Sequence, residues 1–289
     1  MIPPTKEQVL QALAQTDELV PGPRILSQAL RLLSDPKADL RSIAELIRCD
    51  SALAVEVLRC ANSVYYNRKT RAVDLDDAVQ VIGFSETVRL VSLVTTRTTT
   101  NRNLGNYGIA AEDFWAESLF NGLFLEALAQ RFDIADAAEA YTTGLLRFVG
   151  RLAIEQVLTN LGGGLFWDNT APLCEWERDN VGLTQAEVGT QLLRKWGFPE
   201  AMALAIEAQD FNTLNGSDPE PPLVRLAHFG AQVLPAGGGL AAINSRMNPV
   251  IFSPDDPFVK EHSITVESVS AARATACRAF LSVRELLSQ

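Results

Sequence analysis

The sequence predicts an all-α protein, and three observations carry that prediction. Apolar side chains recur at helical spacing, as in Ile43, Leu46 and Ile47, which lie at positions i, i+3 and i+4. Residues that cap helices stand where these periodic segments begin and end. No two segments of alternating polarity are joined by a tight turn, so we expect no β-sheet of consequence.

Polar caps mark the N-terminal helices. Asp50 can cap one helix, and Asp74 can cap another over residues 75–82, which would end at Gly83. Ser85 is placed to cap the helix that follows. The first hundred residues therefore predict a succession of short helices.

Three stretches interrupt the helical pattern. Residues 98–113 are rich in asparagine and glycine, which predicts a linker. This linker divides the chain into an N-terminal helical lobe of residues 1–100 and a larger lobe of residues 101–289. Two further loops are expected over residues 211–222 and 248–257, where proline, glycine and aspartate gather.

The larger lobe carries its own boundary signals. Thr184 and Glu187 have the spacing of a capping box, in which each side chain bonds the other's backbone amide. That helix would stop at Gly197, and Pro199 suits the first turn of the next one. The remaining helices are expected over residues 200–209, 222–234 and 266–287.

Composition excludes several classes of protein. The 289 residues include 25 Lys and Arg against 35 Asp and Glu, a net charge of −10, which disfavours binding to nucleic acid or to an anionic membrane. No apolar segment approaches the roughly 18 residues of a membrane helix. The first residues have neither the basic nor the apolar region of a signal peptide, so we expect a cytoplasmic protein. The four cysteines form no C-x-x-C pair and are expected to be reduced thiols.

Catalytic and metal-binding signatures are missing from the sequence. It contains no phosphate-binding loop of the Walker type, no nucleophile elbow and no zinc-protease motif. Its two histidines, His228 and His262, are not followed by acidic residues. His228 lies in an apolar segment and is expected in or near the core, whereas His262 is expected to be solvated. We therefore predict no cofactor, no metal ion and no catalytic residue.

A series of short motifs runs through most of the chain. The most specific is Leu-Arg-Cys-Ala-Asn-Ser at residues 58–63. The others are residues 76–83, 114–118, 144–146, 150–152, 186–189 and 196–200. Together they resemble the HDOD domain, the HD-related output domain of bacterial signalling proteins, over about residues 20–233. The resemblance implies the HDOD fold, in which an N-terminal helical lobe packs on a larger HD-like helical lobe.

The resemblance also shows which residues stand at the metal-binding positions of related HD phosphohydrolases. Those enzymes hold metal ions with a histidine, a His-Asp pair and a distant aspartate. The corresponding positions here are Glu117, the pair Arg147-Phe148, Gln185, the pair near Gln209-Asp210, and His228. Arginine places a positive charge where a cation would lie, and phenylalanine offers no ligand. The resemblance therefore implies that the metal site and the phosphohydrolase activity are lost.

Two interpretations of these replaced positions remain open. Arg147 needs an acceptor if it is buried, and we expect it to pair with Glu117. The positions then either fill the core or form a pocket for a small anionic ligand. The candidate ligand-binding residues are Glu117, Arg147, Gln185, Gln209 and His228.

The sequence supports two functions from different classes. The first is a non-catalytic signal-transduction module that contacts other proteins, for which the resemblance implies receiver, kinase or cyclic di-GMP enzymes as partners. The second is a degenerate HD scaffold that senses a nucleotide or another small anion. A residual enzyme is the least supported. An interaction module should expose an apolar patch, and the stripe on helix 266–287 is one candidate, although we expect it to pack on the protein's own core. Its residues are Val269, Ala272, Ala276, Cys277 and Phe280.

Overall fold

The computed structural model describes residues 4–14, 24–33, 35–63, 72–168, 170–209, 220–234 and 252–288. Within these ranges the protein is helical, with an isolated bridge between Leu104 and Ile109 in place of any strand, so the all-α prediction is confirmed. In chain order the elements are α1 (Lys6–Ala14), α2 (Arg24–Leu33), α3 (Leu40–Arg48), α4 (Ser51–Ala61), α5 (Leu75–Ile82), α6 (Phe84–Thr100), η3 (Gly105–Tyr107), α7 (Ala111–Phe132), α8 (Ala137–Leu145), α9 (Val149–Asn160), α10 (Leu173–Asn180), α11 (Gln185–Lys195), α12 (Glu200–Glu207), α13 (Pro222–Val233), α15 (Pro257–Glu261) and α16 (Val266–Ser288).

None of the helices in the described ranges could cross a membrane by itself. Helices α5 and α6, which bend by 109° where they meet, satisfy the requirements of length and composition only as a pair.

Aspartates begin three of the N-terminal helices. Asp39, Asp50 and Asp74 precede α3, α4 and α5, and each carboxylate accepts a hydrogen bond from a backbone amide in the first turn. The caps predicted at Asp50 and Asp74 are therefore confirmed. The cap predicted at Ser85 is wrong, because Ser85 lies inside α6. That helix follows directly on Gly83, whose φ of 87° lets the chain turn sharply.

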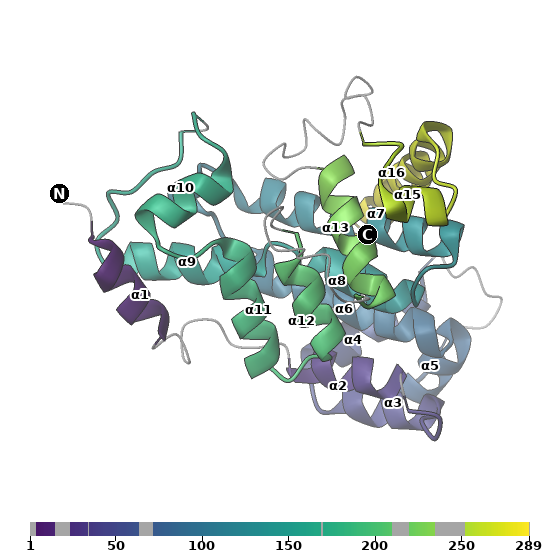
Figure 1. Cartoon of the computed structure of the whole chain (residues 1–289). Coiled ribbons are helices and arrows are strands. Elements are labelled where there is room, and N and C mark those ends of the chain that lie inside the picture. The colour runs from purple at the N-terminus through teal and green to yellow at the C-terminus, as the bar shows by residue number, and fades with distance from the viewer. Residues whose placement is uncertain are drawn as a thin grey trace.

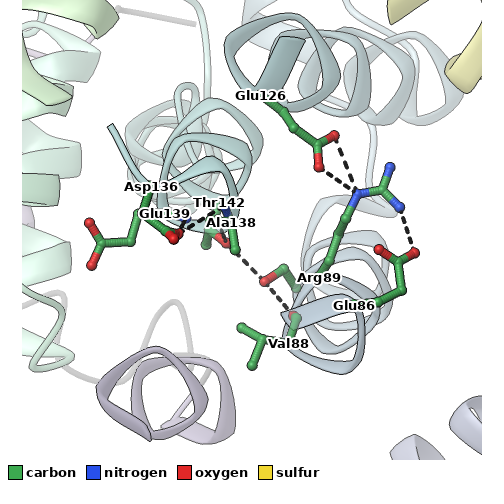
Figure 2. Close-up of polar contacts among 9 residues, drawn as sticks. Glu86, Val88, Arg89, Glu126, Asp136, Ala138, Glu139 and Thr142 are labelled. Carbon is green, nitrogen blue, oxygen red and sulfur yellow. Dashed lines mark hydrogen bonds and ion pairs between the residues drawn. The ribbon is translucent and has the colours of Figure 1, made fainter. Parts of the chain in front are cut away.

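Helix α6 connects the N-terminal helices to the rest of the protein. It contacts α2, α3, α4 and α5, and it also contacts α7 and α8. Figure 2 shows Arg89 of α6 between two carboxylates, that of Glu86 on the same helix and that of Glu126 on α7. A nitrogen of Arg89 lies 3.0 Å from an oxygen of each carboxylate. The buried hydroxyls of Ser92 on α6 and Thr142 on α8 lie 2.9 Å apart. These polar contacts hold α6 against the larger group of helices.

Helix α1 lies apart from α2–α5 and packs against α9 (Figure 1). Lys6 of α1 donates a hydrogen bond to the backbone carbonyl of Arg178 over 2.8 Å. Arg31 of α2 donates another to the carbonyl of Gly197, also over 2.8 Å. The chain before residue 100 thus contacts the later helices through α1, α2 and α6, and the boundary between lobes of residues 1–100 and 101–289 stays a prediction.

Glycines bring the helices around the candidate site close together. A Cβ on Gly144 of α8 would lie 2.5 Å from the carbonyl oxygen of Asn121 in α7. A Cβ on Gly150 of α9 would lie 1.9 Å from the carbonyl oxygen of Gln185 in α11. Backbone atoms cannot rotate away as a side chain does, so both positions require glycine. These approaches place Asn121 beside the end of α8 and Gln185 beside the start of α9.

The predicted linker over residues 98–113 is instead packed structure. Its first three residues complete α6, and the rest contains the short helix η3. The buried Glu155 of α9 accepts hydrogen bonds from two backbone amides of η3, each over 2.9 Å. Asparagine and glycine here form turns that a glutamate distant in sequence satisfies, and local composition does not reveal such a partner.

The predicted C-terminal helices are confirmed. The capping box of Thr184 and Glu187 is present at the start of α11. Two predicted loops, 211–222 and 248–257, lie outside the described residues over 211–219 and 248–251. Their described ends lead into α13 at Pro222 and α15 at Pro257, where proline suits the first turn of a helix.

The long C-terminal helix α16 packs on α7. The ring of Phe280 meets that of Phe120 edge to face, with 6.1 Å between centroids. Cys277 is half-buried, and Val269, Ala272, Ala276 and Phe280 are buried, so the stripe belongs to the protein's own core. His262 is less exposed than predicted, because its side chain is 23% exposed and its ring centre lies 4.8 Å from that of Phe258.

Candidate functional site: a buried two-arginine centre

The replaced positions form a buried centre built on two arginines. Arg151 of α9 is completely buried, and its Nη1 lies 3.2 Å from Oε2 of Glu117 on α7, whose side chain is 7% exposed. The guanidinium carbon of Arg151 also lies 4.0 Å from the centre of the Phe148 ring. Glu117 and Arg151 therefore form a buried ion pair that stacks on an aromatic face.

The second arginine, Arg147, bonds to neutral groups. Its Nη1 donates to the side-chain oxygen of Asn121 over 2.5 Å and to the backbone carbonyl of Leu234 over 2.7 Å. Its guanidinium carbon lies 4.9 Å from the Phe148 ring centre. The expected pair between Arg147 and Glu117 is wrong, because Arg151 in the first turn of α9 forms the ion pair with that carboxylate instead.

The charges of the centre do not balance locally. Burial lowers the pKa of Arg147 to about 10, opposed by the nearby carboxylate of Glu117 and assisted by the charge of Arg151. Arg147 still carries its charge at neutral pH. The single carboxylate of Glu117 therefore faces the two positive charges of Arg147 and Arg151. Three buried guanidinium nitrogens, Nε of Arg147 and both Nε and Nη2 of Arg151, have no hydrogen-bond partner.

Gln185 belongs to a neighbouring polar network. Its backbone amide donates to Oε2 of Glu177 over 2.7 Å, and the hydroxyl of Tyr107 donates to Oε1 of the same carboxylate over 3.0 Å. Burial and the adjacent Glu177 raise the pKa of Tyr107 well above its ordinary value. The side-chain oxygen of Gln185 is buried without a partner. The main role of this residue in the structure is therefore to begin α11 beside Gly150.

Gln209 and His228 form a separate group. Nδ1 of His228 lies 2.7 Å from the carbonyl of Ala208, which only accepts, so Nδ1 is the donor in this hydrogen bond. Nε2 then accepts from Gln232, 2.8 Å away, and Gln209 donates to the carbonyl of Ala205. His228 is half-buried, as expected. The structure thus unites Glu117 with Arg147 and Arg151, while the side chains of Gln209 and His228 bond within α12, α13 and the turn after α12.

Sequence reasoning missed two members of the centre. Asn121 follows Glu117 by four residues on α7, and Arg151 follows Arg147 by four residues. Residues at this spacing share one face of a helix, so Glu117 was a usable signal for Asn121, whereas Arg147 lies in the turn between α8 and α9. Leu234 contributes a backbone carbonyl, for which the sequence carries no signal.

The residues of the centre do not fit a metal ion. Two permanent cations and a phenylalanine stand where carboxylate and imidazole ligands would be needed. A divalent cation about 4 Å from one guanidinium would be repelled by roughly 8 kcal/mol at an effective dielectric constant of about 20. In the described part of the chain, His, Cys, Asp and Glu form no group of three that could hold a metal.

These features define a helical HD-type scaffold whose centre consists of arginine, amide and aromatic side chains. The family model for the HDOD domain matches residues 19–211. The chain therefore belongs to the HDOD family.

Individual relatives agree with this assignment. An uncharacterized protein of Treponema pallidum (strain Nichols) is 26% identical over 219 residues, which are 74% of this chain and 41% of that protein. A crystal structure of a candidate signal transduction protein from Marinobacter aquaeolei matches with a TM-score of 0.71 and 21% identity, over 98% of this chain and 65% of the other. This chain thus spans about two fifths of the first relative and two thirds of the second.

Two further crystal structures share the fold. An HDOD domain protein of unknown function from Geobacter sulfurreducens has a TM-score of 0.62 and 18% identity, over 97% and 95% of the two chains. A candidate phosphohydrolase from Shewanella amazonensis has a TM-score of 0.61 and 20% identity, over 93% and 98%. At these identities the likeness establishes the fold alone.

Proposed function

We propose that this protein is a non-catalytic regulatory module that acts through contacts with other proteins in the bacterial cytoplasm. The observation that carries the proposal is the pair of buried arginines at the centre of the HD-like lobe. Both side chains are guanidinium cations, so they repel the cation that HD hydrolysis needs. Without metal-dependent hydrolysis, the function we propose for this fold is the binding of other proteins.

The proposed partners are signalling proteins that carry receiver, kinase or cyclic di-GMP enzyme domains. Membership of the HDOD family and the fold shared with a candidate signal transduction protein support this choice. The net charge of −10 supports protein partners over nucleic acid or anionic lipid.

The test combines native mass spectrometry with an activity assay. Tagged protein is eluted gently from its own cells, and the masses of intact complexes are measured. A stoichiometric complex with a receiver, kinase or cyclic di-GMP protein is the expected result. Hydrolysis of phosphate monoesters or diesters in the presence of Mg²⁺ or Mn²⁺ would overturn the non-catalytic assignment. A chain recovered with a bound small molecule and no protein would favour the second candidate function.

That second candidate is the sensing of a small anion, and Arg147 favours it. Its guanidinium is buried, and the two groups that accept hydrogen bonds from it, the Asn121 side chain and the Leu234 carbonyl, are neutral. A phosphate or carboxylate group would supply the missing charge and bond to the unpartnered nitrogens. Gln185 and Gln209 add buried amide oxygens without partners, which suit the polar groups of a nucleotide or similar molecule.

Thermal unfolding in phosphate, acetate and chloride at constant ionic strength tests this candidate. A ligand of the native state raises the unfolding temperature by mass action. Sensing predicts a rise with phosphate or acetate that R147Q abolishes. The control is R284Q, because Arg284 is an exposed arginine paired with Glu112. Equal shifts in R147Q and R284Q would eliminate sensing at Arg147.

A further inference from the structure

Helix α1 is a short element that lies on the outside of the larger group of helices. It has nine residues, ends before the part of the chain that matches the HDOD family, and packs on α9 (Figure 1). Isolated helices shorter than about 12 residues are marginal in water. Helix α1 therefore depends for its structure on the surface that it covers.

That surface buries one face of α1. Val9 is completely buried, and Ala12 and Leu13, three and four residues later, are partly buried against the core. Lys6 and Gln11 are exposed. Buried positions at i, i+3 and i+4 are the pattern with which an amphipathic helix binds in an apolar groove of another protein.

The turn between α10 and α11 contacts the start of α1 closely. A Cβ on Gly182 would lie 2.7 Å from Cε of Lys6 and 3.1 Å from Cδ1 of Leu10. The ammonium group of Lys6 donates a hydrogen bond to the carbonyl of Arg178 over 2.8 Å. A helix that binds here thus needs a lysine three residues before its first buried aliphatic side chain.

Helix α9, beneath α1, is the helix that carries Arg151. From Val149 to Leu158 it is buried at every position except Gln156. Release of α1 would expose part of this apolar helix to water, and burial of apolar surface drives the association of proteins. A partner helix that covers α9 therefore replaces the contact that α1 gives up.

We propose that α1 occupies, within its own chain, a helix-docking site for the protein partner. The partner supplies a short amphipathic helix with aliphatic residues at i, i+3 and i+4 and a lysine at i−3, and this helix displaces α1 from α9 and from the turn at Gly182. That the competitor is a signalling protein rests on the proposed function, whereas the site itself does not. Release of α1 then controls contact with the partner.

Helix α1 carries its own start signal, so a peptide can serve as the probe. The amide of Thr5 donates to Oε1 of Gln8 over 2.8 Å, and the amide of Gln8 donates to the Thr5 hydroxyl over 3.4 Å. A synthetic peptide of residues 4–14 with a fluorophore at its C-terminus contains this signal and the buried face.

Fluorescence anisotropy of this peptide with the full chain tests the proposal. V9D places a charge at the buried position, so α1 should leave the site and the peptide should take its place. Because the apparent affinity falls with the fraction of chains whose site is open, we expect V9D to bind the peptide at least about tenfold more tightly than the unmodified chain does.

Q11D is the matched control, because Gln11 is an exposed residue of the same helix and the substitution adds the same charge. Its affinity for the peptide should equal that of the unmodified chain. A peptide that itself carries V9D should bind to none of the three proteins. Circular dichroism verifies that each variant is folded.

Hydrogen exchange of the unmodified chain measures the release of α1 without any substitution. Peptide in excess should accelerate the exchange of the α1 amides, because it takes the place of α1 on α9. The amides of α9 should keep their protection, since α9 stays covered.

Two results would overturn the proposal. One is a V9D variant that binds the peptide no more tightly than Q11D does. The other is an α1 whose exchange is unchanged by excess peptide, which would make α1 a fixed part of the core. Both assays are independent of the partner, so a failure of the proposed function would leave them unaltered. For a partner identified by native mass spectrometry, equal affinities for V9D and Q11D would overturn competition at this site.

Discussion

Removal of the single carboxylate from the arginine centre provides the most direct test of the structure. In E117Q the two guanidinium groups remain buried without a counter-charge. Glu117 and Arg151 are 3.2 Å apart, which corresponds to about 5 kcal/mol of attraction at an effective dielectric constant of about 20. Breaking a buried pair by removing one partner costs about 3–5 kcal/mol, and we expect E117Q to lose that much stability.

Urea unfolding followed by far-ultraviolet circular dichroism measures this loss. The matched control is E112Q on the same helix, because Glu112 and its partner Arg284 are 72% and 44% exposed. An exposed pair of this kind contributes about 0–1 kcal/mol. A loss below about 1 kcal/mol in E117Q, equal to that of the control, would refute the buried pair.

The complementary variant R151M separates charge balance from packing. It leaves Glu117 with Arg147, one charge of each sign, so it should cost less than E117Q, although the contact with Phe148 is lost. The double variant E117Q/R151M should be more stable than the sum of the single losses predicts, because its members interact directly. Additive losses would show that the two side chains act independently.

Three other predictions follow from contacts elsewhere. G144A places a Cβ against the backbone of α7 and should lower the free energy of unfolding in urea by about 1–3 kcal/mol or more. The control G163A has open space around the new Cβ and a φ of 69°, so it should lower that free energy by only about 1–2 kcal/mol. Burial raises the pKa of the Glu126 carboxyl above 4.5, so the folded protein binds a proton at Glu126 more tightly than the unfolded chain does. Protonation of Glu126 therefore contributes stability at low pH, and this contribution is lost as the pH rises through the folded pKa. The variant E126Q should remove that decline from unfolding curves measured just above pH 4.5. Y107F should cost about 1.5–3 kcal/mol, because the buried carboxylate of Glu177 loses a donor over 3.0 Å, and an unchanged unfolding midpoint would contradict that bond.

Local chemistry explains most of what the sequence could predict. The caps at Asp50 and Asp74 and the box of Thr184 with Glu187 depend on neighbours within a few residues, and all are present. The failures involve partners distant in sequence. Glu155 holds the turn that was predicted to be a linker, from about 50 residues away.

The candidate site shows the same division. The sequence indicated that Glu117 and Arg147 replace metal ligands and that Arg147 needs an acceptor. It did not reveal which acceptor, because that depends on the close approach of α8 to α7 at Gly144. That approach places Asn121 against Arg147. Only the three-dimensional packing decides which of two arginines, four residues apart in the sequence, reaches the single carboxylate.

Stability alone does not account for the charged centre. Well-packed apolar side chains commonly replace a buried ion pair with no loss, and often with a gain, of stability. Here the pair of Glu117 and Arg151 is joined by Arg147, an additional buried cation whose Nε has no hydrogen-bond partner. Nearby, the buried hydroxyls of Thr96 and Ser118 also have no hydrogen-bond partner. The arginine centre carries a cost that a bound molecule or a contacting protein would offset, and it involves α7 and the segment that leads into α9. If the centre binds, amides in this segment should exchange hydrogen more slowly in the bound state. A segment whose hydrogen exchange does not change with phosphate or with the protein partner would show instead that the centre is core filling.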